Sequence, residues 1–409
     1  MKKNIIVGQS GGPTAVINAS LYGVITEAKK HYDTIDTIYG MLNGIEGFLE
    51  DRLYNLSSLS SNELECIHTT PGSYLGSCRY KLPEDLDNPI YSQIFSKFEQ
   101  QNIGYFFYIG GNDSMDTVSK LSSYATQIQS SIRIIGIPKT IDNDLIETDH
   151  TPGFGSAAKY VATSVREIGI DASVYDNHPS VTIVEIMGRH AGWLTASSAL
   201  ARKFTGDNPR LIYLPEIAFS PEHFIDKVQT ELKKTPNLVI CISEGIHDEK
   251  GTFICEYSGT TAMDNFGHKM LTGAGKYLES LIKEKLKIKA RSIELNVTQR
   301  CSSISLSKTD LDEATLSGSF GVISALKGFS GQMVSLQRST SKEYHIDYVL
   351  KDASLICNKE KCVPSSWITD DGSDITEEFI QYLTPLIQGE ITLPMKYGIP
   401  CFAYRTHHR

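Results

Sequence analysis

The sequence lacks any uninterrupted apolar run close to the ~20 residues that a membrane-spanning helix needs. The apolar stretch at its start, residues 4–7, is too short for a secretory signal. The sequence also lacks an excess of positive charge, since 48 acidic residues outnumber 39 basic ones and the formal net charge is -9. Nucleic-acid binders need a basic surface that displaces counterions. We therefore expect a cytoplasmic protein that binds neither membrane nor nucleic acid, in which any phosphate chemistry depends on local lysines and arginines.

Paired cysteines are also missing. The eight cysteines are scattered, and none has histidine or cysteine partners at the spacing of a zinc site. Several of them, such as Cys241, lie inside apolar runs, which is typical of a reduced cytosolic protein. Internal repeats and low-complexity linkers are absent as well, so the sequence marks no sharp domain boundary.

What the sequence does contain is an alternation of short β-branched segments with longer helical ones. This pattern is typical of parallel sheets covered by helices. Strands are expected at residues 4–7, 105–109, 132–137, 181–186, 211–214, 238–243 and 292–297. Helices are expected at residues 15–30, 114–124, 156–168, 221–234, 269–285 and 310–327, and a hairpin at 332–337 with 344–350. Because ligands bind at the carboxyl ends of such strands, the loops that follow them are the places to search.

The first two loops are rich in glycine. Residues 8–15 lead from a strand into a helix, where glycines let backbone N–H groups approach a phosphate. Their spacing fits neither a dinucleotide nor a Walker motif, and a tight turn is the alternative. Residues 109–115 also follow a strand, and their amide, carboxylate and hydroxyl oxygens suit a hydrated magnesium ion on phosphate oxygens. A helix cap is the alternative for this second loop.

The third loop, residues 136–145, is the most specific. It brings Lys139, Asp142 and Asp144 to the end of one strand. One carboxylate can take a proton from a substrate hydroxyl, the other can hold a metal ion, and the lysine can neutralise phosphoryl charge. A purely structural cluster of ion pairs would use the same residue types.

Further polar residues follow later strands. Arg189 comes after the strand at 181–186, and Glu244 after the strand at 238–243. Arg291 and Arg300 flank the strand at 292–297. Guanidinium groups suit phosphate recognition, although each of these residues alone could equally form a surface ion pair.

Together these motifs resemble the phosphofructokinase family. The sequence contains G-G-x-x-S, P-x-T-I-D-N-D, M-G-R, S-E-G and Q-R in that order. The resemblance implies an α/β protein with two similar Rossmann-like three-layer domains and mainly parallel sheets. It places the phosphoryl donor on residues 1–150 plus about 301–350, the sugar phosphate on residues 151–300, and a C-terminal tail, residues 351–409, on the core.

The resemblance also implies roles for individual residues. Asp142 would be the base, assisted by Arg189 and Lys139. The residues implied to bind the donor are Gly12, Arg79, Gly111, Asn112, Asp113, Ser114 and Lys139. Those implied to bind the sugar phosphate are Thr140, Asp142, Asp144, Met187, Gly188, Arg189, Glu244 and Arg300, with Arg291 reaching in from a neighbouring subunit. The implied Mg²⁺ ligands are Asp113, Asn112 and Asp144, and a homodimer or homotetramer would share its active sites between subunits.

Two positions distinguish the donor. Asp113 and Lys139 stand where ATP-dependent relatives usually carry glycine, which is typical of the pyrophosphate-dependent branch. The resemblance therefore implies reversible transfer of a phosphoryl group from pyrophosphate to the 1-hydroxyl of fructose 6-phosphate, with Mg²⁺. The alternatives are an ATP-dependent phosphofructokinase or related phosphosugar kinase, and a catalytically silent phosphosugar-binding subunit. Asn112 departs from the family pattern, in which a metal-associated aspartate is usual.

Overall fold

The structure is a computed structural model that describes residues 2–174, 177–258, 273–341 and 343–405. Contacts between residues divide the chain into two compact units. The first unit comprises Met1–Ser156, Arg300–Glu360 and Gln388–Arg409, and the second comprises Ala157–Gln299 and Lys361–Ile387. The chain beyond residue 351 is thus divided between both units.

The first unit is built on a seven-stranded sheet with the order β11-β10-β5-β4-β1-β2-β3. Its strands are β1 (Lys3–Gln9), β2 (Ile35–Met41), β3 (Leu53–Asn55), β4 (Ile103–Gly110), β5 (Arg133–Pro138), β10 (Gln332–Arg338) and β11 (Ile346–Asp352). The five inner strands run parallel, while β3 and β11 at the two edges are antiparallel to their neighbours.

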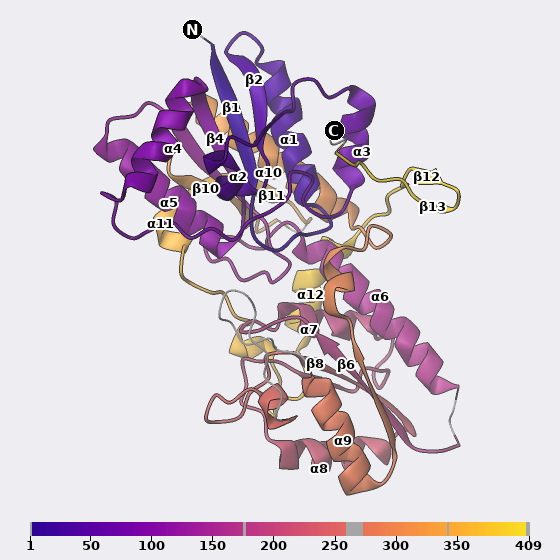
Figure 1. Ribbon diagram of the computed structural model, residues 1–409. Helices are drawn as coiled ribbons and strands as arrows, with labels where there is room; N and C mark the ends of the chain where they lie inside the picture. The colour runs from indigo at the N-terminus through magenta and orange to yellow at the C-terminus, as the bar shows by residue number, and fades with distance from the viewer. Residues whose placement is uncertain (1, 175–176, 259–272, 342, 406–409) are drawn as a thin grey trace. The chain divides into compact units, whose positions relative to one another are not determined.

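Helices cover both faces of this sheet (Figure 1). They are α1 (Ile17–Lys30), α2 (Gly44–Leu49), α3 (Ser61–Thr69), α4 (Pro89–Gln100), α5 (Asn112–Gln127), α10 (Lys308–Leu326) and α11 (Ala353–Ile356). Ile5 and Val7 of β1 pack into one core with α1, α3 and α10, and Ile6 packs into another with α2, α4 and α5. This alternation follows from the two-residue period of a strand, and it produces three layers.

The helices α1 and α10 approach each other closely through two glycines. A Cβ atom on Gly23 would lie 2.0 Å from the carbonyl oxygen of Thr315, and one on Gly318 would lie 2.1 Å from that of Ser20. Any larger residue would therefore push the two helices apart.

The second unit is built on a four-stranded parallel sheet with the order β7-β8-β6-β9. Its strands are β6 (Ser180–Ile186), β7 (Leu211–Tyr213), β8 (Asn237–Ser243) and β9 (Lys289–Glu294). Its helices are α6 (Phe154–Ser173, which begins in the first unit), α7 (Trp193–Ser197), α8 (Pro221–Leu232), α9 (Ala274–Leu286) and α12 (Glu377–Leu383), with 3₁₀ turns at η1 (Ser198–Ala201), η2 (Ile254–Ser258), η3 (Asn296–Arg300), η4 (Ser365–Trp367) and η5 (Thr384–Ile387). Ile183 and Ile240 pack with Phe224 of α8 and Leu278 of α9 in its core.

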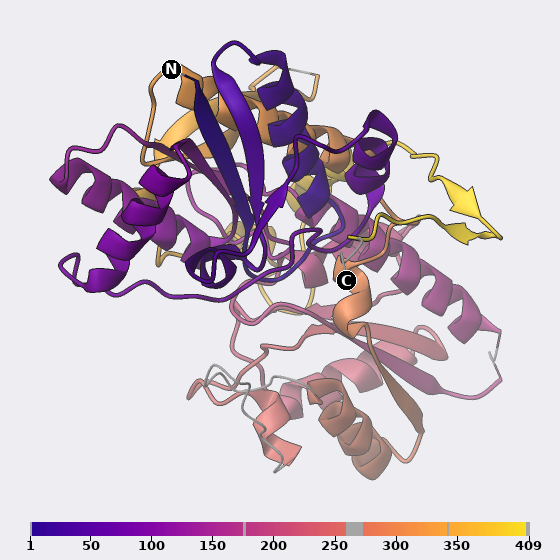
Figure 2. The ribbon, with the colours of Figure 1, turned by 45° about the horizontal axis from the view of Figure 1, so that its top comes forward.

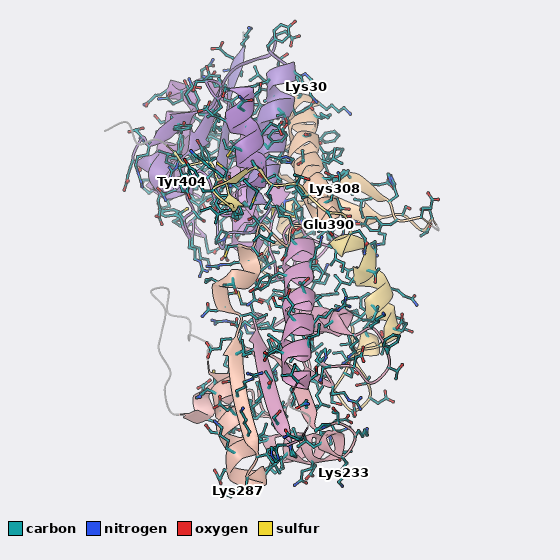
Figure 3. All side chains as sticks on the ribbon, turned by 90° about the vertical axis from the view of Figure 1, so that its right-hand side faces the viewer. Lys30, Lys233, Lys287, Lys308, Glu390 and Tyr404 are labelled. Carbon is teal, nitrogen blue, oxygen red and sulfur yellow. The ribbon has the colours of Figure 1, made fainter. Side chains whose placement is uncertain are left out.

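The last elements form a small hairpin. Strands β12 (Met395–Lys396) and β13 (Ile399–Pro400) pair antiparallel, and the hairpin stands clear of the sheet and helices of its unit (Figure 2). Charged side chains such as Lys233 and Lys287 project from the surface of the second unit (Figure 3). Within the described ranges, no helix combines the length and the apolar character needed to cross a bilayer.

Most predicted elements are present, but one strand was placed wrongly. The strand expected at 292–297 is β9, which covers Lys289–Glu294. Asn296 adopts a left-handed conformation with φ of 46°, and the chain then enters η3. Arg291 therefore lies inside the strand and Arg300 at the end of the 3₁₀ turn, so they do not flank the strand as predicted. The first part of the helix expected at 269–285 lies outside the described residues, and α9 begins at Ala274.

Candidate functional site

The candidate site of the first unit lies at the carboxyl ends of β1, β4 and β5, which are neighbours in the sheet. Gln9 of β1 pairs with Ile109 of β4, and Gly110 of β4 pairs with Pro138 of β5. The three loops predicted from the sequence therefore start side by side at one edge of the sheet.

The first loop is contacted by two cations. Gly11 has a φ of 76°, a conformation that favours glycine. Lys139 Nζ donates a 2.7 Å hydrogen bond to the carbonyl oxygen of Gly12, and a Cβ atom on Gly12 would lie 3.4 Å from Nη1 of Arg300. Positive charge is therefore concentrated beside this backbone turn.

Arg79 belongs to the same region. The N–H of Gly11 donates to the carbonyl oxygen of Cys78 at 3.1 Å, which fixes the segment before Arg79 against the first loop.

Lys139 is buried, and its pKa falls to about 8. Burial is the largest cause, and the charges of Arg300 and Arg79 lower this pKa further, whereas Asp142 and Asp144 oppose the change. The lysine can therefore carry a positive charge near neutral pH and still titrate.

Two carboxylates stand on residues 139–145, the part of the third loop that follows β5, which we call the acid loop. Burial raises the pKa of Asp142, against the opposing effect of Lys139, and burial together with the charge of Asp142 raises the pKa of Asp144 to about 7. The hydroxyl of Thr140 donates to Asp142 Oδ2 at 3.3 Å and accepts from the Asp142 N–H at 3.1 Å. A carboxylate held in this way, with an elevated pKa, is suited to accept a proton.

Two polar atoms in this group have no protein partner. Within the described part of the chain, Asp144 Oδ1 and Arg300 Nε are buried and make no hydrogen bond. Buried polar atoms are nearly always paired in folded proteins. An orphan carboxylate oxygen and an orphan guanidinium N–H favour a site that receives both a cation and an anion.

Residues 110–114 of the second loop, which we call the donor loop, lead into the first turn of helix α5. Asp113 is exposed in the first turn of this helix, and Ser114 is buried against Gly110. The side chain of Asn112 contacts the main chain of residues 358–359, far away in sequence. The magnesium role expected for Asn112 stays a prediction.

The acid loop is held in place by the segment that follows it. The hydroxyl of Thr151 donates to the carbonyl oxygen of Thr140 at 2.9 Å, and Thr140 forms a parallel bridge with Gly153. The carboxylate of Asp310 then accepts 2.8 Å hydrogen bonds from the N–H groups of Gly153 and Ser156 at the start of α6. Asp310 of helix α10 thereby holds the segment at Gly153, with which Thr140 of the acid loop is paired.

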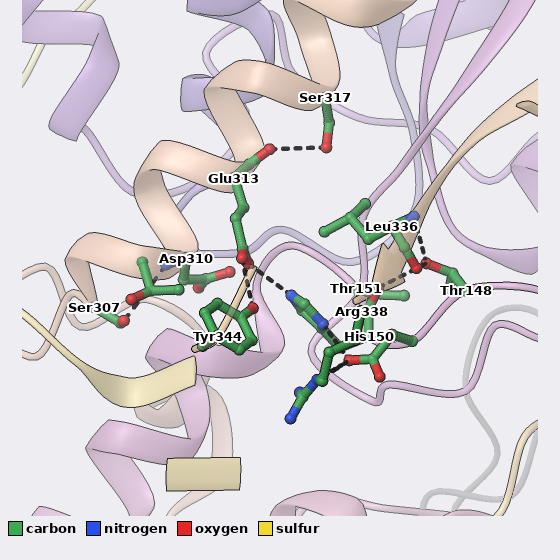
Figure 4. A network of polar contacts seen from close by, with 12 residues as sticks. Thr148, His150, Thr151, Ser307, Asp310, Glu313, Ser317, Leu336, Arg338 and Tyr344 are labelled. Carbon is green, nitrogen blue, oxygen red and sulfur yellow. Dashed lines mark hydrogen bonds and ion pairs between the residues drawn. The ribbon is translucent and has the colours of Figure 1, made fainter. Parts of the chain in front are cut away.

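A buried polar network lies behind the same segment (Figure 4). His150 Nε2 and Nδ1 contact Glu313 at 2.6 Å and Asp149 at 2.8 Å, and both ring nitrogens therefore act as donors to carboxylates. The hydroxyl of Tyr344 donates to Glu313 at 2.6 Å, and Arg338 donates to Asp149 at 2.9 Å. Burial alone would lower the pKa of His150, but the two carboxylates outweigh it and raise this pKa to about 9.

The candidate site of the second unit lies at the carboxyl ends of β6 and β8. Ile186 pairs with Ser243, so the loops that carry Met187, Gly188 and Arg189 and that carry Glu244 start side by side. The N–H of Glu244 donates to the carbonyl oxygen of Ile186 at 2.9 Å, and Ser243 donates to the carbonyl oxygen of Gly188. The backbone thus brings the predicted arginine and glutamate loops together.

Arg291 lies elsewhere in that unit. It pairs with Thr182 in the middle of β9, an edge strand, and not at the carboxyl end. Its guanidinium donates to Asp171 at 2.9 Å and to the hydroxyl of Thr182 at 3.1 Å. Within one chain, Arg291 is therefore not part of the group formed by Arg189 and Glu244.

Sequence reasoning missed three supporting residues: His150, Asp310 and Glu313. Asp310 bonds the segment that follows the acid loop, and His150 and Glu313 bond each other behind that segment. None of the three belongs to a motif with a recognisable spacing. The sequence offered one signal, the run Asp149-His150-Thr151 shortly after the acid loop. Such a run of polar residues is also common on protein surfaces.

The chain is similar to several known proteins. The family model described as phosphofructokinase matches residues 4–318. A pyrophosphate–fructose 6-phosphate 1-phosphotransferase of Halomonas elongata is 40% identical over 408 residues, which cover 99% of this chain and 97% of that protein. A protein of the same name from Xanthomonas campestris is 40% identical over 97% of this chain and 93% of its own length. Among solved structures, a pyrophosphate-dependent phosphofructokinase from Marinobacter aquaeolei has a TM-score of 0.88 and 38% identity, over 98% of this chain and 95% of that one.

Proposed function

Because the chain belongs to the phosphofructokinase family, we propose the following assignment of its residues to the steps of that family's reaction. The protein transfers a phosphoryl group from pyrophosphate to the 1-hydroxyl of fructose 6-phosphate, and it yields fructose 1,6-bisphosphate and phosphate. The assignment rests on the group of cations and carboxylates at the carboxyl edge of the first unit's sheet.

The donor binds among the cations of the first unit. Lys139, Arg79 and Arg300 surround the first loop, where the backbone of Gly11 and Gly12 turns toward them. Pyrophosphate is a small polyanion, and electrostatic stabilisation and positioning supply most of the catalysis in phosphoryl transfer. Gly111 and Ser114 of the donor loop complete the binding surface, and Asp113 excludes a nucleotide by its volume and charge.

Asp142 acts as the base. It takes the proton of the sugar 1-hydroxyl while that oxygen forms a bond to the transferred phosphorus. The bond between the same phosphorus and the bridging oxygen of pyrophosphate breaks, and phosphate leaves. Lys139 neutralises charge on the transferred group, and in the reverse direction Asp142 returns the proton.

Magnesium fits the residues that are present. The orphan oxygen of Asp144 and the exposed carboxylate of Asp113 are hard oxygen ligands of the kind that Mg²⁺ takes, and the ion usually keeps several waters. When bound, Mg²⁺ would shield the negative charge of pyrophosphate.

Residues of each unit are assigned roles toward the acceptor. Arg189 and the backbone of Met187 and Gly188 receive the sugar phosphate, and Glu244 accepts hydrogen bonds from sugar hydroxyls. Thr140 orients the reacting end beside Asp142, and Arg300 contributes positive charge. Arg291, exposed on an edge strand, serves the site of a neighbouring subunit, so the working enzyme is a homodimer or homotetramer.

The test is a coupled assay with fructose 6-phosphate, Mg²⁺ and either pyrophosphate or ATP at equal concentrations. We expect fructose 1,6-bisphosphate and phosphate to form with pyrophosphate, and little product with ATP. Faster turnover with ATP would support the ATP-dependent alternative. Binding of fructose 6-phosphate without turnover of either donor would support the silent subunit.

A further inference from the structure

A short segment of the first unit lies against both the donor loop and the acid loop. It consists of residues 356–360, which we call the strap. It begins at the last residue of helix α11, and directly after Glu360 the chain enters the second unit at Lys361. The sequence analysis assigned it no function.

The strap is attached to the donor loop by the side chain of Asn112. The amide nitrogen of Asn112 donates to the carbonyl oxygen of Lys359 at 2.5 Å, and its amide oxygen accepts from the N–H of Asn358 at 2.6 Å. Asn358 has a φ of 60°, a left-handed conformation that asparagine tolerates. Both ends of one carboxamide are therefore used to hold two consecutive residues of the strap.

Only a carboxamide of this length can make both bonds. Asparagine carries a donor and an acceptor on one planar group, whereas aspartate carries acceptors only. A carboxylate at position 112 could accept from Asn358, but it would face the carbonyl oxygen of Lys359 without a proton to share. This requirement gives a physical reason for an amide at a position where the sequence suggested a metal-binding oxygen.

The root of the strap is fixed by apolar packing. Ile356 is fully buried in a small cluster with Met115 from the first turn of α5 and Leu145 from the acid loop, and Met333 completes the buried set. Cys357 packs against the same cluster. The strap is thereby anchored to the elements that carry both Asp113 and Asp144.

The far end of the strap places a charge near the reacting carboxylates. The negative charge of Glu360 contributes to raising the pKa of both Asp142 and Asp144. Glu360 thus acts on the same acidic pair from a segment more than two hundred residues away in sequence.

The chain after the strap is hydrogen bonded within the second unit. The indole N–H of Trp193 donates to the carbonyl oxygen of Lys361 at 2.8 Å, and the N–H of Val363 donates to Glu216 at 2.8 Å. The chain is therefore hydrogen bonded within the first unit before Glu360 and within the second unit after it. Asn112 makes the side-chain hydrogen bonds in the first unit.

We infer that Asn112 is a positioning residue, which holds the strap against the donor loop and the acid loop and thereby sets the geometry in which pyrophosphate binds. This inference depends on the proposed assignment of these loops to the donor. In this role the Asn112 amide acts through its two hydrogen bonds to the strap, and Asn112 does not need to contact a metal ion.

The experiment compares Asn112→Ala, Asn112→Ser and Asn112→Asp with the unmodified enzyme. In each we would measure KM for pyrophosphate, KM for fructose 6-phosphate, kcat, and amide hydrogen exchange of residues 356–360. Losing two hydrogen bonds of ordinary strength corresponds to a change on the order of tenfold. We expect Asn112→Ala and Asn112→Ser, which lose both bonds, to raise KM for pyrophosphate about tenfold, and Asn112→Asp, which keeps an acceptor for Asn358, to raise it less. All three variants should speed exchange in the strap and leave KM for fructose 6-phosphate within about twofold.

The matched control is Lys359→Ala. The Lys359 side chain is exposed and only its carbonyl oxygen is bonded to Asn112, so this variant should keep both the exchange pattern and the KM for pyrophosphate.

Three outcomes would overturn the inference. Normal donor kinetics in Asn112→Asp would indicate that an oxygen ligand suffices at position 112. Unchanged exchange in the strap would show that Asn112 does not hold it. Faster exchange with an unchanged KM for pyrophosphate would show that the strap does not shape the donor site. The unmodified enzyme's use of pyrophosphate in the same assay tests the proposed function separately.

Discussion

The ammonium group of Lys139 donates a hydrogen bond to the carbonyl oxygen of Gly12, so the third loop of the first unit is tied directly to the first. The two residues are 127 positions apart in the chain. Because Lys139 is buried and surrounded by Arg79, Arg300, Asp142 and Asp144, a change at this position alters the electrostatics of the whole candidate donor site.

The first prediction concerns donor selection. Lys139→Gly should mainly impair the use of pyrophosphate, because it removes a cation from a small donor. Asp113→Gly should allow measurable binding of ATP, because Asp113 is exposed and its removal opens space without disturbing the core.

The double variant should shift the ratio of kcat/KM for ATP over pyrophosphate further than either single change, and the effects need not be additive because the residues share one site. Four enzymes assayed with both donors at saturating magnesium give this ratio, and an unchanged ratio in the double variant would show that these residues do not select the donor.

The second prediction concerns the base. Asp142→Ser should lower kcat by ~10²–10⁴-fold, with little change in either KM, because the proton acceptor is lost while the binding groups remain. Steady-state kinetics measure the effect. Asp312→Asn removes a carboxylate of the same type from the exposed surface of α10 and should have normal kinetics. A kcat close to that of the unmodified enzyme in Asp142→Ser would exclude the proposed role.

The third prediction concerns pH and stability. The pKa of His150 is about 9 in the folded protein, above its ordinary value of ~6.5. The groups that face it are Asp149 and Glu313, with Arg338 and Tyr344 bonded to these carboxylates. The contribution of His150 to the free energy of unfolding is therefore complete below about pH 6.5 and is lost as pH rises through about 9. The loss is a few kcal/mol at most, since one pKa unit corresponds to about 1.4 kcal/mol.

Urea unfolding between pH 6 and 9.5 tests this dependence. We expect His150→Gln to flatten the decline in unfolding free energy over that range, because glutamine does not titrate. A decline of equal steepness in the variant and the unmodified protein would assign the pH dependence to other groups.

The fourth prediction compares two glycines of one helix. Gly318→Ala should destabilise the first unit by about 1–3 kcal/mol, because its Cβ atom would meet the backbone of α1 at 2.1 Å. Gly321→Ala should be close to neutral, because its Cβ atom would lie 3.4 Å from the side chain of Ile137 and alanine favours helix. Chemical denaturation of both variants gives the comparison, and similar stabilities would contradict the close packing of α1 and α10.

The sequence by itself determined the family, the α/β class and the order of the loops. These predictions are confirmed by the comparisons and by the fold. The hairpin predicted at 332–337 with 344–350 is also confirmed, as the antiparallel pair β10 and β11. Such features were accessible because hydrophobic periodicity and short motifs are local, and each loop follows its strand directly in the chain.

The tertiary structure alone decided which residues support those loops. Asn112 meets the main chain of residues 358–359, and His150 meets Glu313, because sheet and helix packing bring distant segments together. A main-chain carbonyl gives no signature in the sequence, so the partner of Asn112 could not be predicted. The strand at 292–297 was placed wrongly for a related reason: its apolar pattern continues past the left-handed turn at Asn296, where the backbone leaves the sheet.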